Sequence, residues 1–227
     1  MCYTGLVHDR RLDGEALVFG NQGALFMQAM TWFDLETESI WSQPWGSAIA
    51  GPLEGRALTL LPAEVVPWST WLAEHPGTTV LAGDLGDDRS YGLEGLRDGF
   101  VIGVAIGENA VGYHYRAAAE AGVVNDDIGD RPVVVLVDPG SRAIKVYLRV
   151  VPGPAPADGA GQRDGLTFSA DDDGRLTDVE TGSTWDAARG VATDGPLTGA
   201  QLQRVPYVTS FDWAWEDFFP ATRFWGG

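Results

Sequence analysis

The stretch that decides the fold runs from Asp34 to Val80 and reads DLETESIWSQPWGSAIAGPLEGRALTLLPAEVVPWSTWLAEHPGTTV. Residues Asp178 to Phe224 match it without a gap, at a constant offset of 144, and read DVETGSTWDAARGVATDGPLTGAQLQRVPYVTSFDWAWEDFFPATRF. Sixteen of the 47 aligned residues are identical, against roughly three expected by chance from average composition. Most of the identical residues are Gly, Pro, Trp and turn formers, which backbone geometry and core packing require. The sequence therefore predicts an internal duplication.

Each copy shows the same succession of local signals. Asp-x-Glu-Thr is typical of a tight turn, because Asp and Thr side chains bond nearby backbone N–H groups. Gly-Pro-Leu-x-Gly predicts a second turn, followed by a strand over Leu58–Leu61 in the first copy and Leu202–Val205 in the second. A short helix with bulky side chains at helical spacing comes next and ends at Pro76 or Pro220. Core packing is expected for the tryptophans that both copies share: Trp41, Trp71, Trp185 and Trp215.

The duplication is expected to extend upstream as a hairpin before each copy. The first hairpin is predicted from Tyr3–His8 and Ala16–Phe19, and the second from Val133–Val137 and Ala143–Val150. Between the copies the pattern predicts strands over Phe100–Ile106 and Ala110–Tyr115, a short helix over Ala117–Ala121, and a Gly- and Asp-rich loop over Gly83–Asp98.

These elements favour a mainly-β fold, a sandwich or barrel of two pseudo-symmetric halves built on residues 34–80 and 178–224, each with a short Trp-bearing helix. The Pro-, Ala- and Gly-rich stretch 151–165 is interpreted as a surface loop rather than a domain linker, because the repeat straddles it. Residues 1–227 are therefore expected to form a single domain of two intertwined repeats, neither of them stable alone.

The charge, the apolar runs and the cysteine count of the chain exclude several classes of function. The formal charge is −17, which argues against a nucleic-acid clamp and against binding to anionic membranes. No apolar run approaches the roughly 18 residues of a membrane span, and the chain as given carries no export signal, although a lost leader stays open. With one cysteine, Cys2, no intrachain disulfide is expected. Compartment and oligomeric state are not predicted.

The run from Phe33 to Pro62 resembles the bacterial and archaeal family known as domain of unknown function 3179. AGVVND at 121–126, PVVVLVD at 132–138, ETGSTW at 180–185 and the closing FDWAWEDFFPATRF agree with it. The resemblance spans nearly the whole chain and implies a family but no activity. Members of the family typically carry an N-terminal Cys-x-x-Cys pair, of which Cys2 matches the second cysteine and the first is absent. The chain is either truncated or from a branch that lost the pair, which puts two-thiol chemistry in doubt.

A duplicated fold allows a search for function without an alignment, because a polar residue in one copy opposite a bland one in the other can mark a site. The contrasts are Gln43/Ala187, Trp45/Arg189, Ser47/Val191 and His75/Phe219. We expect a small-molecule pocket at the repeat junction, near Gln43, Trp45, His75 and Cys2, with Trp45 lining it for a planar or apolar ligand. Drift at exposed positions of a diverged duplication is the alternative explanation.

A soft-metal site is a second form of the binding hypothesis. Thiolate and thioether ligands suit monovalent copper, and Met27-x-x-Met30 near Cys2 would place two sulfurs on one face of a helix. Methionines at these positions fit a hydrophobic core equally well.

An enzyme and a structural or interaction module are the other two hypotheses. The catalytic candidates are Cys2, His75 and His114, with a histidine acting as base or Cys2 as nucleophile. In Tyr113-His114-Tyr115, strand alternation sends His114 to the face opposite the two tyrosines. Whether the protein is an enzyme stays open, since motifs for nucleotide, zinc-protease and hydrolase chemistry are missing.

Overall fold

The computed structural model describes residues 5–64, 66, 68–80, 99–151, 165–171 and 174–226. Cys2, the loop predicted over 83–98 and most of the stretch 151–165 lie outside these residues. The described chain is mainly β, with three short helices: α1 (Trp68–Glu74), α2 (Tyr115–Ala121) and α3 (Asp212–Phe218). No described sheet closes on itself, so of the two predicted architectures the structure resembles a sandwich and not a barrel.

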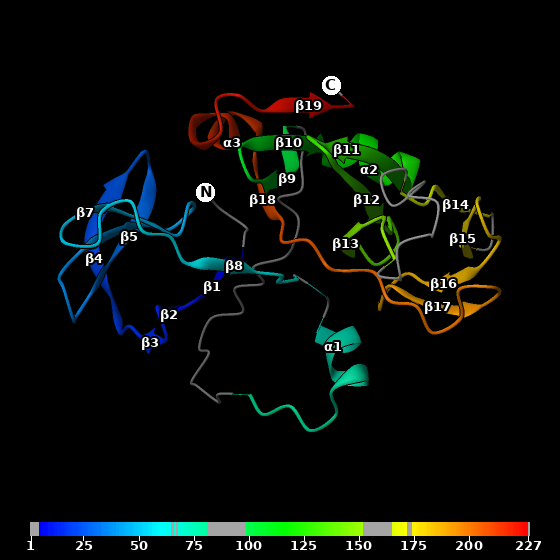
Figure 1. The fold of residues 1–227 in the computed structure, drawn as a ribbon, viewed down its shortest axis with the longest axis horizontal. Coiled ribbons are helices and arrows are strands. Elements are labelled where there is room, and N and C mark those ends of the chain that lie inside the picture. Colours follow the sequence, from blue (N-terminus) through cyan, green and yellow to red (C-terminus); the bar gives the residue numbers. More distant parts are fainter. Residues whose placement is uncertain are drawn as a thin grey trace, which may run out of the picture.

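Two four-stranded antiparallel sheets lie at opposite ends of the molecule (Figure 1). The N-terminal one contains β4 (Phe19–Phe26), β5 (Ala29–Asp34), β6 (Ile40–Ser42) and β7 (Ser47–Ala50). The C-terminal one contains β14 (Phe168–Ala170), β15 (Leu176–Asp178), β16 (Thr184–Asp186) and β17 (Val191–Asp194). The bounds of β6, β7 and α1 recur 144 residues later in β16, β17 and α3.

The sheets between these ends are assembled from strands far apart in sequence. The first contains β18 (Val208–Phe211), β9 (Phe100–Ile106), β10 (Asn109–His114) and β19 (Arg223–Trp225), in that order. The second contains β11 (Val123–Ile128), β12 (Arg131–Val137) and β13 (Ile144–Leu148). Two small sheets are formed by β1 (Val7–Asp9) with β8 (Thr59–Leu61), and by β2 (Arg11–Leu12) with β3 (Glu15–Ala16).

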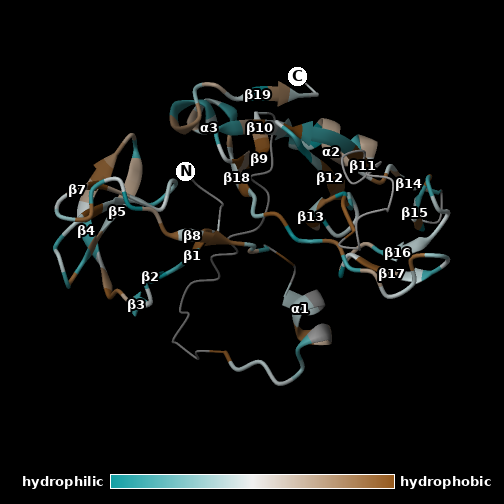
Figure 2. Cartoon of the chain, in the orientation of Figure 1, coloured by the Kyte–Doolittle hydropathy of each residue, from teal (hydrophilic) through white to brown (hydrophobic). Residues whose placement is uncertain are grey.

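Strand β12 is the centre of the hydrophobic core. Its run PVVVLV is buried on both faces, as expected of a strand covered on two sides, and it lies among the hydrophobic segments of Figure 2. Val133, Val135 and Val137 pack with β9, β10 and α2. Val134 and Leu136 pack instead against the C-terminal sheet around Trp185 and Phe168. This three-layer packing is the sandwich-like part of the fold.

The Asp-x-Glu-Thr turn has the same hydrogen bonds in both copies, as the sequence predicts. Asp34 Oδ1 accepts bonds from the Thr37 backbone N–H at 2.6 Å and from the Thr37 hydroxyl at 2.8 Å, while Trp41 Nε1 donates to Asp34 Oδ2 at 2.8 Å. Asp178 accepts the corresponding bonds from Thr181 and Trp185 at 2.7, 2.7 and 2.9 Å. Burial alone raises the pKa of Asp34, but these bonds outweigh it and leave the pKa below its usual value.

The predicted first hairpin is wrong in its pairing. Strand β1 pairs with β8 through His8↔Leu60, and the Asp13-Gly14 turn joins only the short strands β2 and β3. In the second copy Tyr147 of β13 forms the bridge with Arg204, which lies 144 residues after Leu60. Strand β1 therefore corresponds to β13 at an offset of 139, and not to β12 as the sequence suggested. A short strand carries little sequence information about its register and its partner. The sequence pattern therefore did not indicate that β1 pairs with the distant strand β8.

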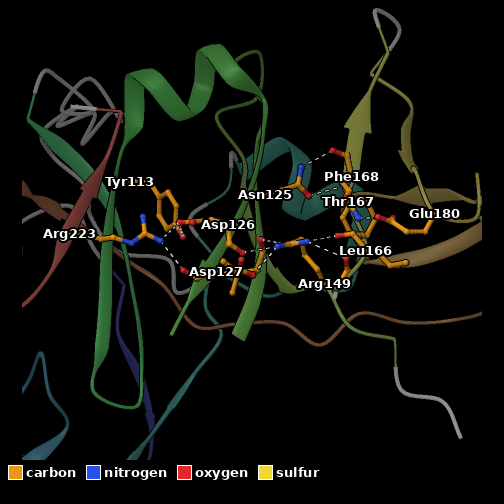
Figure 3. A network of polar contacts seen from close by, with 12 residues as sticks. Tyr113, Asn125, Asp126, Asp127, Arg149, Leu166, Thr167, Phe168, Glu180 and Arg223 are labelled. Carbon is orange, nitrogen blue, oxygen red and sulfur yellow. Dashed lines mark hydrogen bonds and ion pairs between the residues drawn. The ribbon is translucent and has the colours of Figure 1, made fainter. Parts of the chain in front are cut away.

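Arg149 holds three neighbouring segments together (Figure 3). Its guanidinium donates to the carbonyls of Val133 at 2.8 Å, Leu166 at 2.8 Å and Asp126 at 3.1 Å, and to Asp127 Oδ1 at 3.0 Å. In the same network Asp126 accepts a bond from the Tyr113 hydroxyl at 2.8 Å. Burial, followed by the Asp126 charge, raises the pKa of Tyr113.

Helices α1 and α3 have the same internal contacts but different surroundings. Trp71 Nε1 donates to Thr78 Oγ1 at 2.9 Å, and Trp215 Nε1 donates to Thr222 Oγ1 at 2.8 Å. Trp215 is 1% exposed, whereas Trp71 is 41% exposed. Core packing is therefore confirmed for Trp41, Trp185 and Trp215 and wrong for Trp71.

The cause lies in strands β9 and β10, which cover Trp215. A Cβ added at Gly103 would lie 2.4 Å from the Trp215 ring, so this close approach needs glycine there; one at Gly112 would lie 3.2 Å from the same ring and 2.8 Å from Phe224. Among the described residues Trp71 has no such cover, and in Figure 1 α1 lies apart from the sheets.

His8 gives a prediction on pH-dependent stability. Its Nε2 lies 3.0 Å from the Gln43 carbonyl. The corresponding bond of the second copy runs from the Tyr147 hydroxyl to the carbonyl of Ala187, which lies 144 residues after Gln43. Burial lowers the pKa of His8, although the bond to Gln43 acts in the opposite direction. Because the lowered pKa means that the unfolded chain binds the proton more readily than the folded chain, protonation of His8 favours unfolding. The folded state is therefore fully stable with respect to His8 above about pH 6.5, and it loses stability as pH falls from there toward the lowered pKa of the folded state.

We therefore expect His8→Tyr, which copies Tyr147, to remove a loss of stability that the wild-type chain shows between pH 7.5 and 5.5. Urea unfolding at the two pH values measures it. His75→Gln serves as the control and should keep the wild-type pH dependence. Equal pH dependence in wild type and His8→Tyr would contradict the assignment to His8.

Candidate functional site

A cavity of about 680 Å³ lies between α1 and the second copy of the repeat. One wall comes from the segment after β8 and from α1, and the other from the β12–β13 hairpin, the β16–β17 turn and Arg204. Among the described residues, the lining consists of Pro62, Ala63, Glu64, Val66, Trp71, His75, Leu136, Asp138, Ser141, Ala143, Lys145, Asp186, Ala187, Ala188, Arg189 and Arg204. We call this cavity with its walls the open junction.

Two cations meet one carboxylate inside the open junction. Glu64 forms a salt bridge with Lys145, the single lysine of the chain, and a second with Arg204, whose Nη1 lies 2.7 Å from Glu64 Oε1. The side chains of Lys145 and Glu64 are only 14% and 19% exposed, while that of Arg204 is 44% exposed. The shielded position makes these charges interact more strongly than they would on an open surface.

The wall formed by α1 is aromatic. The rings of Trp71 and His75 lie 4.1 Å apart at 39°, and the indole N–H of Trp71 is held by Thr78. Both rings line the cavity. A flat ring wall of this kind offers stacking area to a planar molecule.

The corresponding place between α3 and β1 is occupied by an apolar cluster. There Val208 and Trp215 are buried in one cluster, with Leu6, Leu60 and Phe219 packed against them. By the offsets given above, these residues stand where the open junction has Glu64, Trp71, Lys145, Arg204 and His75. We call this apolar cluster the closed junction. The two places thus differ in kind, one being an apolar cluster and the other a cavity lined by charged side chains.

A scan against models of protein families matches the one described as "Protein of unknown function (DUF3179)" over residues 1–98 and 96–222. The chain belongs to the DUF3179 family. Searches of curated proteins and of solved structures return no match. In this DUF3179 chain the first matched segment supplies α1 and Glu64, and the second supplies Lys145, Arg189 and Arg204. The cavity therefore lies where the two matched segments face each other.

The structure separates the residues that the sequence placed at the junction. His75 lines the cavity. Trp45 does not, because its Nε1 donates to the Phe218 carbonyl at 3.0 Å and its ring packs edge-to-face on Phe218, next to the closed junction. Gln43 is half-buried and accepts the bond from His8 through its backbone carbonyl. Of the Trp45/Arg189 contrast, it is Arg189 that lines the cavity of the DUF3179 chain.

The remaining candidates lie elsewhere. Cys2 is outside the described residues. Met27 and Met30 are not on a helix, because Met27 lies in the β4–β5 turn and Met30 on β5, so the predicted helical face is wrong. The turn residues Met27 and Gln28 adopt positive φ, which a helix does not allow. His114 ends β10, and its ring packs on Phe224, while Tyr113 is buried on the other face as expected.

Three residues of the site were missed by the sequence reasoning: Glu64, Lys145 and Arg204. The Glu64/Val208 and Leu60/Arg204 contrasts are visible in the gapless alignment and could have been found there. The Leu6/Lys145 contrast needs the offset of 139, which only the pairing of β1 with β8 provides. Within the described part of this DUF3179 chain, no group of three His, Cys, Asp or Glu side chains is arranged to hold a metal ion. None of its described helices is long and apolar enough to span a membrane.

Proposed function

We propose that this protein binds a small organic molecule in the open junction. The observation that carries the proposal is the cavity of about 680 Å³ with an aromatic wall on α1 and a charged floor at Glu64, Lys145 and Arg204. Ligand pockets typically enclose roughly 300–1,000 Å³ and combine apolar walls with a few converging polar groups.

Comparison with the closed junction supports a ligand site rather than a cavity left by imperfect packing. At the closed junction, Leu, Val and Phe side chains stand at the corresponding positions and pack against one another. An apolar contact between elements arranged in this way is therefore sterically possible. Placing Lys145 and Glu64 in a shielded position costs desolvation free energy that an apolar filling avoids. Stability alone therefore does not account for the charges, which supports a role for them in ligand recognition.

Between a small-molecule ligand and a soft metal, the lining favours the small molecule. Among the described residues no methionine lines this cavity, and Cys2 lies outside them; soft metals such as monovalent copper prefer sulfur ligands. The Trp71 and His75 rings instead fit a planar organic body.

A neutral aromatic probe tests the proposal. We expect N-phenyl-1-naphthylamine to bind wild-type protein with one-to-one stoichiometry, and Trp71→Ala to weaken it by about tenfold or more, because burying an aromatic face contributes about 1.5 kcal/mol or more. Fluorescence titration gives both numbers.

Trp68→Ala is the matched control, since Trp68 lies on the same helix, is 52% exposed and does not line the cavity. It should change the affinity less than twofold. Ala188→Trp, which fills the cavity from the opposite wall, should block binding without touching α1. Equal affinities in Trp71→Ala, Trp68→Ala and Ala188→Trp would contradict the proposed site.

A further inference from the structure

We infer that the ligand of the open junction is a small aromatic carboxylate, with its carboxylate at Lys145 and Arg204 and its ring against Trp71 and His75. This inference rests on the proposed function, since it names the ligand class of the same cavity. Its experiment must therefore distinguish an empty cavity from a cavity that prefers another class of molecule.

The charges of the described lining residues balance in number but not in position. Asp186 accepts bonds from the backbone N–H groups of Ala188 and Arg189 and pairs with the Arg189 guanidinium at 3.2 Å. Asp138 accepts bonds from the Gly140 N–H and the Ser141 hydroxyl at 2.8 and 2.5 Å. Both carboxylates are thus engaged with the turns that carry them.

The floor is different, because among the described residues Glu64 alone forms salt bridges with both Lys145 and Arg204. Two positive charges facing one negative charge leave a surplus of one positive charge. In a chain with 15 basic and 32 acidic residues, a shielded lysine and an arginine that converge on one carboxylate make this part of the cavity locally positive. A ligand carboxylate would neutralise the surplus through charge-assisted hydrogen bonds to an ammonium and a guanidinium.

Glu64 marks the position that an incoming carboxylate would share. It stands where the closed junction has Val208, so the fold accepts an apolar side chain there and does not require the acid. Its carboxylate competes with the ligand for both cations. Removing that charge should strengthen the binding of an anion and leave the binding of a neutral ring nearly unchanged.

The aromatic wall indicates that the apolar part of the ligand is an aromatic ring. Trp71 stays 41% exposed although its indole N–H is bonded, so it is the ring face and edge that are available. Leu136, Ala143 and Ala187 add apolar surface beyond the floor. An aromatic ring bearing one carboxylate places an apolar body on this wall and its charge at the two cations.

Calorimetric titration with 2-naphthoate and its neutral amide, 2-naphthamide, tests the inference. In wild-type protein we expect the carboxylate to bind at least tenfold more tightly than the amide. Arg204→Gln should remove most of this preference and Glu64→Gln should increase it about tenfold. Arg56→Gln, which alters an exposed Arg56–Asp13 pair away from the cavity, should leave it unchanged.

The single lysine provides a readout that needs no variant. Saturating 2-naphthoate should slow acetylation of Lys145 several-fold, measured by mass spectrometry of the digested chain, and 2-naphthamide should protect it much less. If the amide and the carboxylate bind equally and protect equally, the ligand class is wrong while the proposed function stands. If neither molecule binds or protects, both the ligand class and the proposed pocket are overturned.

Discussion

Replacing Asp34 or Asp178 with alanine is expected to lower the free energy of unfolding by about 3–4 kcal/mol, since each variant leaves a buried indole N–H and the half-buried donors of a threonine without the carboxylate that accepts their bonds. In the first copy these donors are the Trp41 indole N–H and the backbone N–H and hydroxyl of Thr37. Trp41 and Asp34 are both 0% exposed, so water cannot replace the lost carboxylate without disturbing the sheet.

Urea unfolding followed by tryptophan fluorescence measures the effect. Asp194→Ala is the matched control, because Asp194 is an exposed acid at the end of β17 and should change stability by less than about 0.5 kcal/mol. Because the pKa of Asp34 is lowered, its contribution is present above about pH 4 and is lost as pH falls through the folded pKa. A loss below 1 kcal/mol in both alanine variants would show that the Asp–Thr–Trp turn does not hold these sheets.

The sequence predicts well what depends on local chemistry. The Asp-x-Glu-Thr turn, the two short Trp-bearing helices and the β9–β10 strands were all predicted, because turn residues, helical spacing and alternation act over a few residues. What it could not predict is which distant strands meet. Strand β1 pairs with β8 rather than with its neighbour, and the cover of Trp215 by Gly103 and Gly112 has no counterpart at Trp71.

The candidate site follows the same rule. The His75/Phe219 contrast points to the open junction, where His75 lines the cavity. Of the Trp45/Arg189 contrast, Arg189 lines this cavity, whereas Trp45 packs on Phe218. Which of two corresponding residues faces a cavity depends on the element packed against it, and a single sequence does not contain that information.

Whether both halves of the chain behave as equivalent units stays a prediction, and Arg149 offers a way to weigh their difference. Arg10 occupies the corresponding place in the first copy, at the offset of 139, and donates to the Leu17 carbonyl at 3.2 Å as Arg149 does to Leu166 at 2.8 Å. Arg10 is exposed, whereas Arg149 is 8% exposed. The two arginines therefore make a similar local hydrogen bond, but only Arg149 is buried.

We expect Arg149→Met to lower the free energy of unfolding by about 3–5 kcal/mol, as found when one member of a buried charged network is removed. The methionine keeps much of the side-chain volume but leaves the Val133, Leu166 and Asp126 carbonyls without their donor. Arg10→Met should cost less than about 1 kcal/mol, because water can replace an exposed guanidinium. Urea unfolding of both variants decides between two explanations. Similar small losses would mean that the β11–β13 sheet and the C-terminal sheet are held by apolar packing alone, and a large loss confined to Arg149→Met would assign that role to its guanidinium.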